Sequence, residues 1–547
     1  MNSAAEDLKR ASRHLRGAIL EELALERPDF TKETVQILKF HGTYQQSDRD
    51  LRKAMQPAQF GSMVRVGIPG GALTAEQYLQ LDRLADQVGD GGLRITTRQD
   101  IQFHRVRKSD LRGLIRTLNQ NLLSTLAACG DVVRNVVCCP APFGDAARSR
   151  IQQLAQSLSK ALKPATRAYY DIWLDGEKVV SAESAPPEDE PLYGPAYLPR
   201  KFKIGFAAPG DNCIDVYSND VGIVPDGDRF TLLVGGGLGM TAGVKNTHPR
   251  LAEPLASVEP DRLQAAVEAI VGIHRDYGNR ANRKFARLKY VLEEWGLPRF
   301  QAEFESRLGA PAAPPAALHW NTSSDHFGWH SEAGGAWFLG LPIPSGRVRD
   351  PLRSGLRDLV QRFHLGVRLT SQQNLLLTGI PAAQRAEVAQ AAAAHGIRIA
   401  EQLPPVVREA LACVALPTCG LAIAEGERVM PELLAALHGA MTDAGIGEDS
   451  ISVRVTGCPN GCARPYTAEI GIVGRSVDLY ALYLGASHLG TRLGSVYAEN
   501  VPRRDIAGRL RPLFHSYAAE RQANESFGDF CHRLGFETLK AREAAAA

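Results

Sequence analysis

Four cysteines in the C-terminal half of the chain have a spacing that suits metal ligation. Cys413 and Cys419 form one close pair, and Cys458 and Cys462 form a second pair that begins 39 positions after the first pair ends. The second pair encloses Pro-Asn-Gly, in which the proline fixes its own φ and the glycine can adopt a positive φ. This loop can therefore turn tightly enough for both sulfur atoms to face one centre. A helical pattern follows Cys419, and a helix N-terminus near the thiols would favour their deprotonated form.

Three interpretations of these cysteines are open from their spacing. Structural zinc sites usually separate the two members of a pair by two to four residues, which C-x5-C and C-x3-C fit poorly. Ligation of a [4Fe–4S] cluster by four cysteines is the second interpretation. Chance burial of small apolar thiols is the third. The spacing favours the cluster over the other two.

The bulk composition describes a multidomain globular protein. A chain of 547 residues predicts three or four folding units, and 44% hydrophobic with 22% charged residues is typical of a soluble protein. The net charge of +3 gives no indication of a nucleic-acid or membrane partner. The N-terminus has no apolar signal region, and no apolar run reaches the roughly 18 residues that span a bilayer. Nine cysteines in such a chain predict reduced thiols and a cytoplasmic location.

An internal duplication predicts how the cysteines are positioned. The strand–helix–strand pattern ending in Leu93-Arg-Ile-Thr-Thr-Arg-Gln99 returns 274 positions later as Val367-Arg-Leu-Thr-Ser-Gln-Gln373. A second series pairs Lys203-Ile-Gly-Phe with Glu469-Ile-Gly-Ile, and Asp215-Val-Tyr with Asp478-Leu-Tyr. This register places the stretch before Lys203 where the other half has its Cys458–Cys462 loop. It predicts two similar halves around a shared cleft, one holding a redox centre and the other presenting cations.

The domain organisation follows from this repeat and from a Pro/Ala-rich linker after position 308. We predict an N-terminal extension, a first half-domain, a first large domain, a linker, a second half-domain and a second large domain, at residues 1–61, 62–126, 127–308, 309–327, 328–400 and 401–547. A glycine-rich stretch at 234–239 lacks the helix and acidic residue of a dinucleotide fingerprint. No flavin or nicotinamide module is otherwise visible, so electrons must arrive from another protein.

These features together resemble the sulfite and nitrite reductases that couple sirohaem to a [4Fe–4S] cluster, and most of all the assimilatory sulfite reductase haemoprotein (beta subunit) branch. The similarity runs from Phe40-His-Gly-Thr-Tyr-Gln-Gln-Ser-Asp-Arg-Asp50 to Gly528-Asp-Phe530, and its most specific segment is Thr456-Gly-Cys-Pro-Asn-Gly-Cys-Ala-Arg464. The resemblance implies an α+β fold that is internally duplicated with pseudo-twofold symmetry. Two ferredoxin-like half-domains would pair into one domain, and two larger α/β-type domains would surround a central cofactor cleft.

The resemblance also implies roles for individual residues. Cys413, Cys419, Cys458 and Cys462 would ligate the cluster, and the Cys462 thiolate would also be the axial ligand of the sirohaem iron. The substrate cations would be Arg65, Arg134, Lys201 and Lys203. Taken singly, each of these basic residues would be interpreted as a solvated surface charge. The Lys-x-Lys spacing places both lysine side chains on one face of a strand.

Sirohaem carries eight carboxylates, so further donors are expected around it. Even spacing on a single strand predicts that four side chains face it, namely Arg94, Arg98, Gln102 and His104. Arg280, Arg283 and Arg287 follow at helical spacing, with an exposed basic helix face as the alternative. Asn460 would donate to the haem or to a cluster sulfur.

The other cysteines receive no functional assignment. Cys138 and Cys139 lie shortly after Arg134, where the resemblance implies no pair of cysteines, and buried structural thiols are the favoured interpretation. Cys129, Cys213 and Cys531 match no functional position of the family.

The predicted function is the six-electron reduction of sulfite to sulfide. Nitrite reductases of the family tend to carry an uncharged amide residue at the second lysine of the pair, so Lys203 favours sulfite, and nitrite reduction is the alternative. The resemblance implies an NADPH-oxidising flavoprotein or ferredoxin as electron donor. A zinc-stabilised binding protein without redox chemistry is the alternative from another class.

Overall fold

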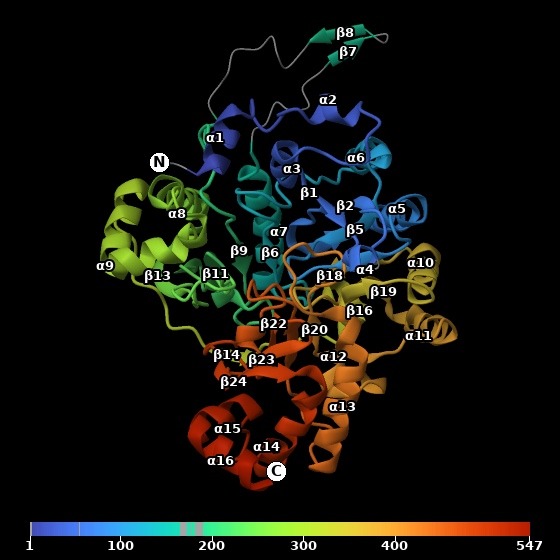
Figure 1. The fold of residues 1–547 in the computed structure, drawn as a ribbon, viewed down its shortest axis with the longest axis vertical. Helices are drawn as coiled ribbons and strands as arrows, with labels where there is room; N and C mark the ends of the chain where they lie inside the picture. The colour runs from blue at the N-terminus through green and yellow to red at the C-terminus, as the bar shows by residue number, and fades with distance from the viewer. Residues whose placement is uncertain (1–2, 54, 165–171, 175–176, 181–189, 547) are drawn as a thin grey trace.

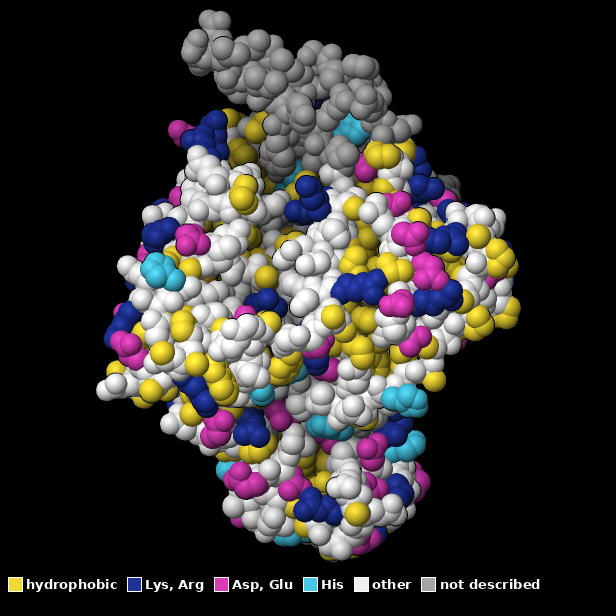
Figure 2. All heavy atoms as spheres, turned by 180° about the vertical axis from the view of Figure 1, so that it is seen from behind, with side chains coloured by type: hydrophobic (Ala, Val, Ile, Leu, Met, Phe, Trp, Pro, Cys, Tyr) yellow, Lys and Arg dark blue, Asp and Glu magenta, His cyan; other side chains and the backbone are white. Residues whose placement is uncertain are grey.

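The computed structural model describes residues 3–53, 55–164, 172–174, 177–180 and 190–546. In this part of the chain no helix is long and apolar enough to cross a membrane. Figure 2 shows basic and acidic side chains interspersed over one face of the molecule, in line with the small net charge of +3. Recognition of a small anion must therefore come from local placement of cations.

Two half-domains share one strand order. The first sheet has the order β1-β2-β5-β4-β17 and the second has the order β15-β16-β19-β18-β3. In the first half-domain the elements are β1 (Thr43–Ser47), β2 (Phe60–Val66), α5 (Ala75–Gln87), β4 (Leu93–Ile95) and β5 (Ile101–Val106). In the second they are β15 (Gly328–Ser331), β16 (Ala336–Leu341), α10 (Leu352–Phe363), β18 (Gly366–Leu369) and β19 (Leu375–Pro381). The predicted duplication of strand–helix–strand units is confirmed.

The half-domains exchange edge strands. β17 (Arg347–Val348) belongs to the second repeat but pairs with β4 of the first, and β3 (Ala72–Leu73) belongs to the first repeat but pairs with β18 of the second. Helices α5 and α10 lie side by side, and Arg357 Nη2 pairs with Asp86 Oδ2 across them at 2.9 Å. Pairing each outer strand with the other repeat removes an exposed edge from both sheets. The two half-domains therefore form one body (Figure 1).

Each half also contains a larger domain with a five-stranded sheet. The two strand orders are β13-β12-β11-β9-β6 and β20-β21-β22-β23-β24. The strands of the first sheet are β6 (Val137–Cys138), β9 (Ile204–Phe206), β11 (Val221–Asp226), β12 (Arg229–Val234) and β13 (Glu253–Val258). Those of the second are β20 (Leu411–Ala412), β21 (Val453–Thr456), β22 (Ile470–Ser476), β23 (Leu479–Leu484) and β24 (Ser495–Pro502). In the first sheet, neighbouring strands are parallel from β6 through β9 to β11 and antiparallel from β11 through β12 to β13. In the second sheet, they are parallel from β20 through β21 to β22 and antiparallel from β22 through β23 to β24.

Helices cover these two sheets. The first large domain contains α7 (Ala146–Ala161), α8 (Leu263–Tyr277) and α9 (Leu288–Leu308), and the second contains α13 (Met430–Asp443), α14 (Ile506–Glu520), α15 (Phe527–Leu534) and α16 (Phe536–Ala546). The second domain has an apolar core of its own, between Val406 and Leu539, whereas the first shares a core with the half-domains. In Figure 1 the second domain accordingly forms the separate lower lobe in orange and red.

The strand order corrects the predicted register of the second repeat. Strand β9 (Ile204–Phe206) lies next to β6, as β21 lies next to β20, so β9 corresponds to β21. Lys203-Ile-Gly-Phe therefore does not match Glu469-Ile-Gly-Ile, which leads into β22. The segment that matches Glu469 begins at Asp220, 249 positions earlier, and it leads into β11 as Glu469 leads into β22. The prediction was wrong because β9 and β11 carry similar short apolar sequences. The counterpart of the Cys458–Cys462 loop therefore follows β9 and does not precede it.

An ion pair joins corresponding positions of the two halves. Asp215 and Arg464 are 249 positions apart, both have a left-handed backbone (φ 52° and 56°), and each begins a short 3-10 helix. Arg464 Nε lies 2.7 Å from Asp215 Oδ2, and Arg454 Nη1 lies 2.6 Å from the same oxygen. All three side chains are buried, so one carboxylate opposes two guanidinium groups in the interior.

We expect Asp215→Asn to destabilise the protein by about 3–5 kcal/mol, because two buried guanidinium groups lose their opposing charge. The melting temperature of the variant, measured by calorimetry against wild type, tests this expectation. Asp228→Asn is the control, because Asp228 is exposed in the turn between β11 and β12. Equal melting temperatures for Asp215→Asn and wild type would contradict the expected contribution.

Candidate functional site

The two cysteine pairs follow the ends of two adjacent parallel strands. Cys413 comes directly after β20, and its backbone N–H donates to Val455 O at 3.1 Å. Cys458 and Cys462 follow β21, which runs parallel to β20. The C-terminal ends of parallel strands lie at one edge of a sheet, so the fold brings both pairs to the same place.

Hydrogen bonds hold the cysteine loops together. Gly457 O accepts from the backbone N–H groups of Ile423 and Ala424 at 2.8 and 3.0 Å. Gly457 N–H lies 3.3 Å from Cys413 Sγ, and Asn460 Nδ2 lies 3.5 Å from Cys458 Sγ. Asn460 thus donates toward the sulfur of Cys458, and its predicted role toward the haem or a cluster sulfur stays a prediction.

Burial and a neighbouring charge change the pKa of three of the four thiols. Burial raises the pKa of Cys413 and of Cys419, and the pKa of Cys458 rises to about 11 for the same reason. A negative charge on Cys462 raises all three further, which places Cys462 close to the other thiols. Four thiolates together need a positive centre, which a bound metal cluster provides.

Among the described residues, the four cysteines do not form a group whose sulfur atoms are close enough to hold a single metal ion. Within the described ranges, no three of the four sulfur atoms lie within 4.8 Å of one another. Zinc–sulfur bonds of about 2.3 Å in a tetrahedron require sulfur atoms about 3.8 Å apart. The described residues therefore do not form a preformed zinc site from these four cysteines.

The predicted substrate cations come from neighbouring segments of the first half. Arg65 lies on β2, and Lys201 and Lys203 flank Phe202 just before β9. Arg134 donates its backbone N–H to Phe202 O at 2.8 Å, so it lies beside the lysines. The Phe202 side chain is fully buried, and alternation turns the two lysines to the opposite face.

These cations face one another and Cys462. Burial, together with the charges of Arg200 and Arg287, lowers the pKa of Lys201 to about 7. Burial, followed by the charge of Lys201, holds the pKa of Lys203 well below its usual value. A negative charge on Cys462 acts in the opposite direction on both lysines and on Arg65. The fold therefore brings the cations and the exposed Cys462 thiol together.

Within the described residues, no carboxylate forms a salt bridge with this group of cations. Among the residues that the structure describes, no Asp or Glu oxygen lies within 4.0 Å of the side-chain nitrogens of Arg65, Arg134, Lys201 or Lys203. Arg134 donates to the backbone oxygens of Gly130 and Ala128 at 2.9 and 3.4 Å. Partly buried cations without counter-ions repel one another, so an anionic group bound among them would be stabilised. The arrangement fits a cofactor and a substrate that are both anionic.

Of the predicted sirohaem contacts, Arg94 and Gln102 lie opposite each other on β4 and β5. The prediction of a single strand is wrong, because residues 96–100 form a turn between the two strands. Arg94 Nε pairs with Glu427 Oε2 at 2.9 Å. Gln102 accepts from Arg65 Nη2 at 2.6 Å and donates toward His104 Nε2 at 3.3 Å, in the amide orientation that satisfies both partners. Gln102 and His104 therefore adjoin the cation group.

The other predicted arginines have protein partners. Arg98 donates to Asn219 Oδ1 at 2.6 Å and to Ile204 O at 2.7 Å. Arg287 pairs with Asp220 Oδ2 at 2.8 Å. The prediction of helical spacing for 280–287 is wrong, because the only helical turn there is the 3-10 turn Arg283–Phe285. Arg280 and Arg283 instead lie against Glu6 of α1 (Ala4–Ala11).

Two residues beside Arg65 escaped sequence analysis. Burial raises the pKa of the Asp100 carboxyl to about 7, although Arg65 and Arg98 oppose this shift. Burial also raises the pKa of Tyr44, which hydrogen-bonds with Cys129. The duplication provides a signal for Asp100, since the corresponding residue is the uncharged Asn374.

Comparison with protein families gives two matches. The family described as "Nitrite and sulphite reductase 4Fe-4S domain" matches residues 154–312, and "Nitrite/Sulfite reductase ferredoxin-like half domain" matches residues 55–121 and 330–395. The first match contains Lys201 and Lys203 but none of the four cysteines, which lie in the second copy of the repeat. The second confirms the two predicted ferredoxin-like half-domains.

Curated relatives match nearly the whole chain. It is 44% identical to "Sulfite reductase [ferredoxin]" of Synechococcus elongatus, covering 98% of this chain and 90% of the relative. It is also 44% identical to "Sulfite reductase [NADPH] hemoprotein beta-component" of Myxococcus xanthus, and the match covers 97% of this chain and 96% of the relative. The solved structure of Mycobacterium tuberculosis NirA protein has the same fold, with a TM-score of 0.80 at 23% identity and coverage of 98% and 97%. The chain therefore belongs to the nitrite and sulfite reductase family.

Proposed function

We propose that this protein is an assimilatory sulfite reductase haemoprotein, which reduces sulfite to sulfide with six electrons supplied by a separate protein. The observation that carries the proposal is the group of four cations without carboxylate partners, which faces the thiol of Cys462. Sulfite is a small oxyanion with one or two negative charges near neutral pH. A group of cations would bind the sulfite anion and slow its dissociation.

In this proposal the four cysteines, Cys413, Cys419, Cys458 and Cys462, hold a [4Fe–4S] cluster. Cys462 is the exposed member of the set, and its thiolate would also hold the sirohaem iron. The bound cofactors would supply electrons to substrate at the haem. Arg94, Arg98, Gln102, His104, Arg287 and Asn460 are assigned to the surroundings of the cofactors. Gln102 and His104 can act directly, whereas Arg98 and Arg287 would act mainly by positioning Asn219 and Asp220.

The cations would do more than bind the anion. Arg65, Arg134, Lys201 and Lys203 would draw electron density toward the sulfite oxygens and so weaken each sulfur–oxygen bond. Each oxygen leaves as water and needs protons, which an ammonium group of lowered pKa donates more readily than an ordinary lysine. The two lysines suit this role, because both have a lowered pKa.

Sulfite is favoured over nitrite because Lys203 adds charge beside Lys201. Nitrite carries a single negative charge and gains less from a second ammonium group. Nitrite reduction to ammonia remains the second candidate, since the family includes both activities by its description.

The electron donor is a separate protein in this proposal. One relative is named as ferredoxin-dependent and another as NADPH-dependent, so both donors are candidates. Sulfite-dependent oxidation of reduced ferredoxin, and of NADPH with a flavoprotein subunit, would distinguish them. We also propose a cytoplasmic location, where reduced thiols and an oxygen-sensitive cluster persist, and the domain limits given above.

Anaerobic purification followed by absorption spectroscopy and iron analysis tests the proposed function. We expect a chlorin-type visible spectrum, iron in excess of the haem, and sulfide release from sulfite. A colourless, iron-free protein after cofactor reconstitution would overturn the proposal and favour a non-redox binding protein.

A further inference from the structure

The repeat places two further cysteines at positions that correspond to cluster ligands. Cys139 follows β6 as Cys413 follows β20, and its backbone N–H donates to Phe206 O at 3.1 Å, as that of Cys413 donates to Val455 O. Cys213 lies two residues before Asp215, as Cys462 lies two residues before Arg464. The first correspondence has the 274-position offset of the half-domains, and the second follows from the corrected 249-position register.

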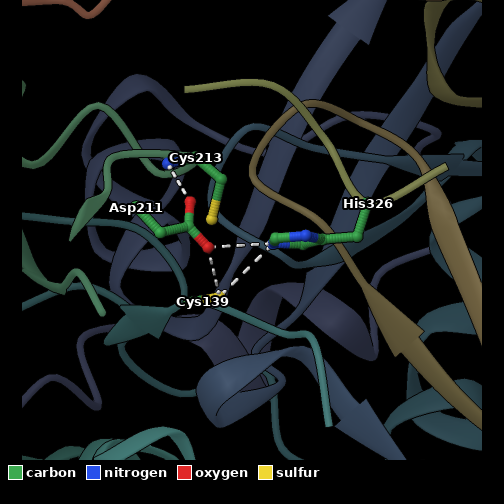
Figure 3. A group of neighbouring side chains, drawn as sticks. All are labelled: Cys139, Asp211, Cys213 and His326. Carbon is green, nitrogen blue, oxygen red and sulfur yellow. Dashed lines mark hydrogen bonds and ion pairs between the residues drawn. The ribbon is translucent and has the colours of Figure 1, made fainter. Parts of the chain in front are cut away.

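The first half lacks the other two thiols. The position 249 residues before Cys458 is Pro209, and the position 274 residues before Cys419 is Asp145. Two cysteines cannot hold a second cubane cluster by thiolate ligation alone. Asp211 and His326 instead approach the remaining pair, and one ligand atom from each of Cys139, Asp211, Cys213 and His326 lies within 4.8 Å of the others (Figure 3).

Three of the six separations among the ligand atoms match the edges of a zinc tetrahedron, and the others lie below 4.8 Å. Cys139 Sγ lies 3.5 Å from His326 Nε2 and 3.4 Å from Asp211 Oδ2, and His326 Nε2 lies 3.2 Å from Asp211 Oδ2. Usual zinc bond lengths of about 2.3 Å to sulfur and about 2.0–2.1 Å to nitrogen and oxygen give edges of about 3.5, 3.5 and 3.3 Å. Thiolate and imidazole ligands favour zinc over magnesium or calcium.

The surroundings hold each group in place. All four residues are buried, between 1% and 9% exposed. Arg148 Nη2 donates to Asp211 Oδ2 at 2.8 Å, and the Cys213 N–H donates to Asp211 Oδ1 at 3.1 Å. Next to His326, Asp325 Oδ2 accepts from Thr370 at 2.6 Å. Two thiolates and one carboxylate around a divalent cation carry a net charge of −1, which Arg148 opposes at Asp211.

We propose that Cys139, Asp211, Cys213 and His326 form a structural zinc site, separate from the haem and cluster site. Four protein ligands close the coordination shell, as in structural rather than catalytic zinc sites. His326 lies in the segment that enters the second half-domain, between β14 (Trp320–Thr322) and β15, whereas the other ligands belong to the first large domain. The ion therefore ties the connection between the two halves to the first half.

The test uses the holoenzyme purified from cells grown with zinc. We expect about one zinc per chain by mass spectrometry. At the zinc X-ray absorption edge, which is independent of the iron signal, we expect about two sulfur neighbours and two nitrogen or oxygen neighbours. Cys213→Ser and His326→Ala should each lose most of the zinc while iron content stays at the wild-type value. These variants should also melt at a lower temperature.

Cys138→Ser is the matched control, since Cys138 is buried beside Cys139 but lies outside the set. It should retain zinc. A wild-type holoenzyme that binds no zinc when equilibrated with micromolar zinc, or zinc without sulfur neighbours, would overturn the proposal even if a variant fails to fold. Loss of iron together with zinc in every variant would also count against a separate site. Absence of the sirohaem spectrum with zinc retained would instead refute the proposed function alone.

Discussion

Replacing Cys462 by serine is expected to lower the rate of sulfite reduction by at least about 10³-fold. The spectroscopic signals of haem and cluster should also lose their coupling. Serine keeps the size of the side chain but is a poor ligand for iron at neutral pH, since its hydroxyl is far harder to deprotonate than a thiol and soft sulfur ligands suit these clusters. Cys462 is also the exposed thiol whose charge acts on Lys201 and Lys203. The loss should therefore affect both electron delivery and the substrate site.

The measurement is the absorption and electron paramagnetic resonance spectrum of the purified variant, together with its sulfite turnover. Cys531→Ala provides the control, because Cys531 is buried in α15 within the core of the same domain. It should retain both cofactor signals. A Cys462→Ser enzyme with the wild-type coupled spectrum would rule out the shared thiolate.

Lys203→Ala should lower kcat/KM for sulfite by about 10²–10³-fold while leaving the cofactor spectrum intact. The reason is the loss of one of the cations that would bind and protonate the anion. The folded state should tolerate the change well, because Lys203 is crowded by Lys201, Arg287 and Arg98 and has no carboxylate partner in the described part of the chain. A lost salt bridge, by contrast, would lower stability.

Steady-state kinetics with sulfite and nitrite, and a melting curve, separate these effects. Lys203→Asn should lose more activity toward sulfite than toward nitrite, since the more highly charged anion depends more on the ammonium group. Lys284→Ala is an exposed control and should behave as wild type. Unchanged kcat/KM in Lys203→Ala would remove that residue from the substrate site.

Local sequence patterns predicted the repeated half-domains correctly. They failed to predict which strands of the two halves are equivalent and where one strand ends in a turn. The 274-residue repeat of Leu93–Gln99 was recognisable because turn residues recur at fixed offsets, and the half-domains have that arrangement. The second register failed because short apolar segments on β9 and β11 look alike, and only strand order distinguishes them. The turn at residues 96–100 escaped notice because period-two spacing continues across it.

The proposed zinc site illustrates the same limit. Its ligands Cys139 and His326 lie 187 positions apart, with no short motif that joins them. Cys213 was left without a role because the incorrect register hid its correspondence with Cys462. Once strand order fixes the repeat, Cys139 and Cys213 correspond to Cys413 and Cys462. A role could therefore be proposed for these cysteines only after the equivalent strands of the two halves were known.

The buried contact between Asp215 and Arg464 also constrains how such a duplicated chain can be divided. Two identical copies of the first half, assembled face to face, would bring two aspartates together, and two copies of the second would oppose two arginines. Like charges held a few ångströms apart in the interior are strongly unfavourable. If the chain were cut at the linker, two identical fragments would bind each other less tightly at this contact than the two complementary fragments would. Opposite charge at one equivalent position therefore favours pairing of unlike repeats.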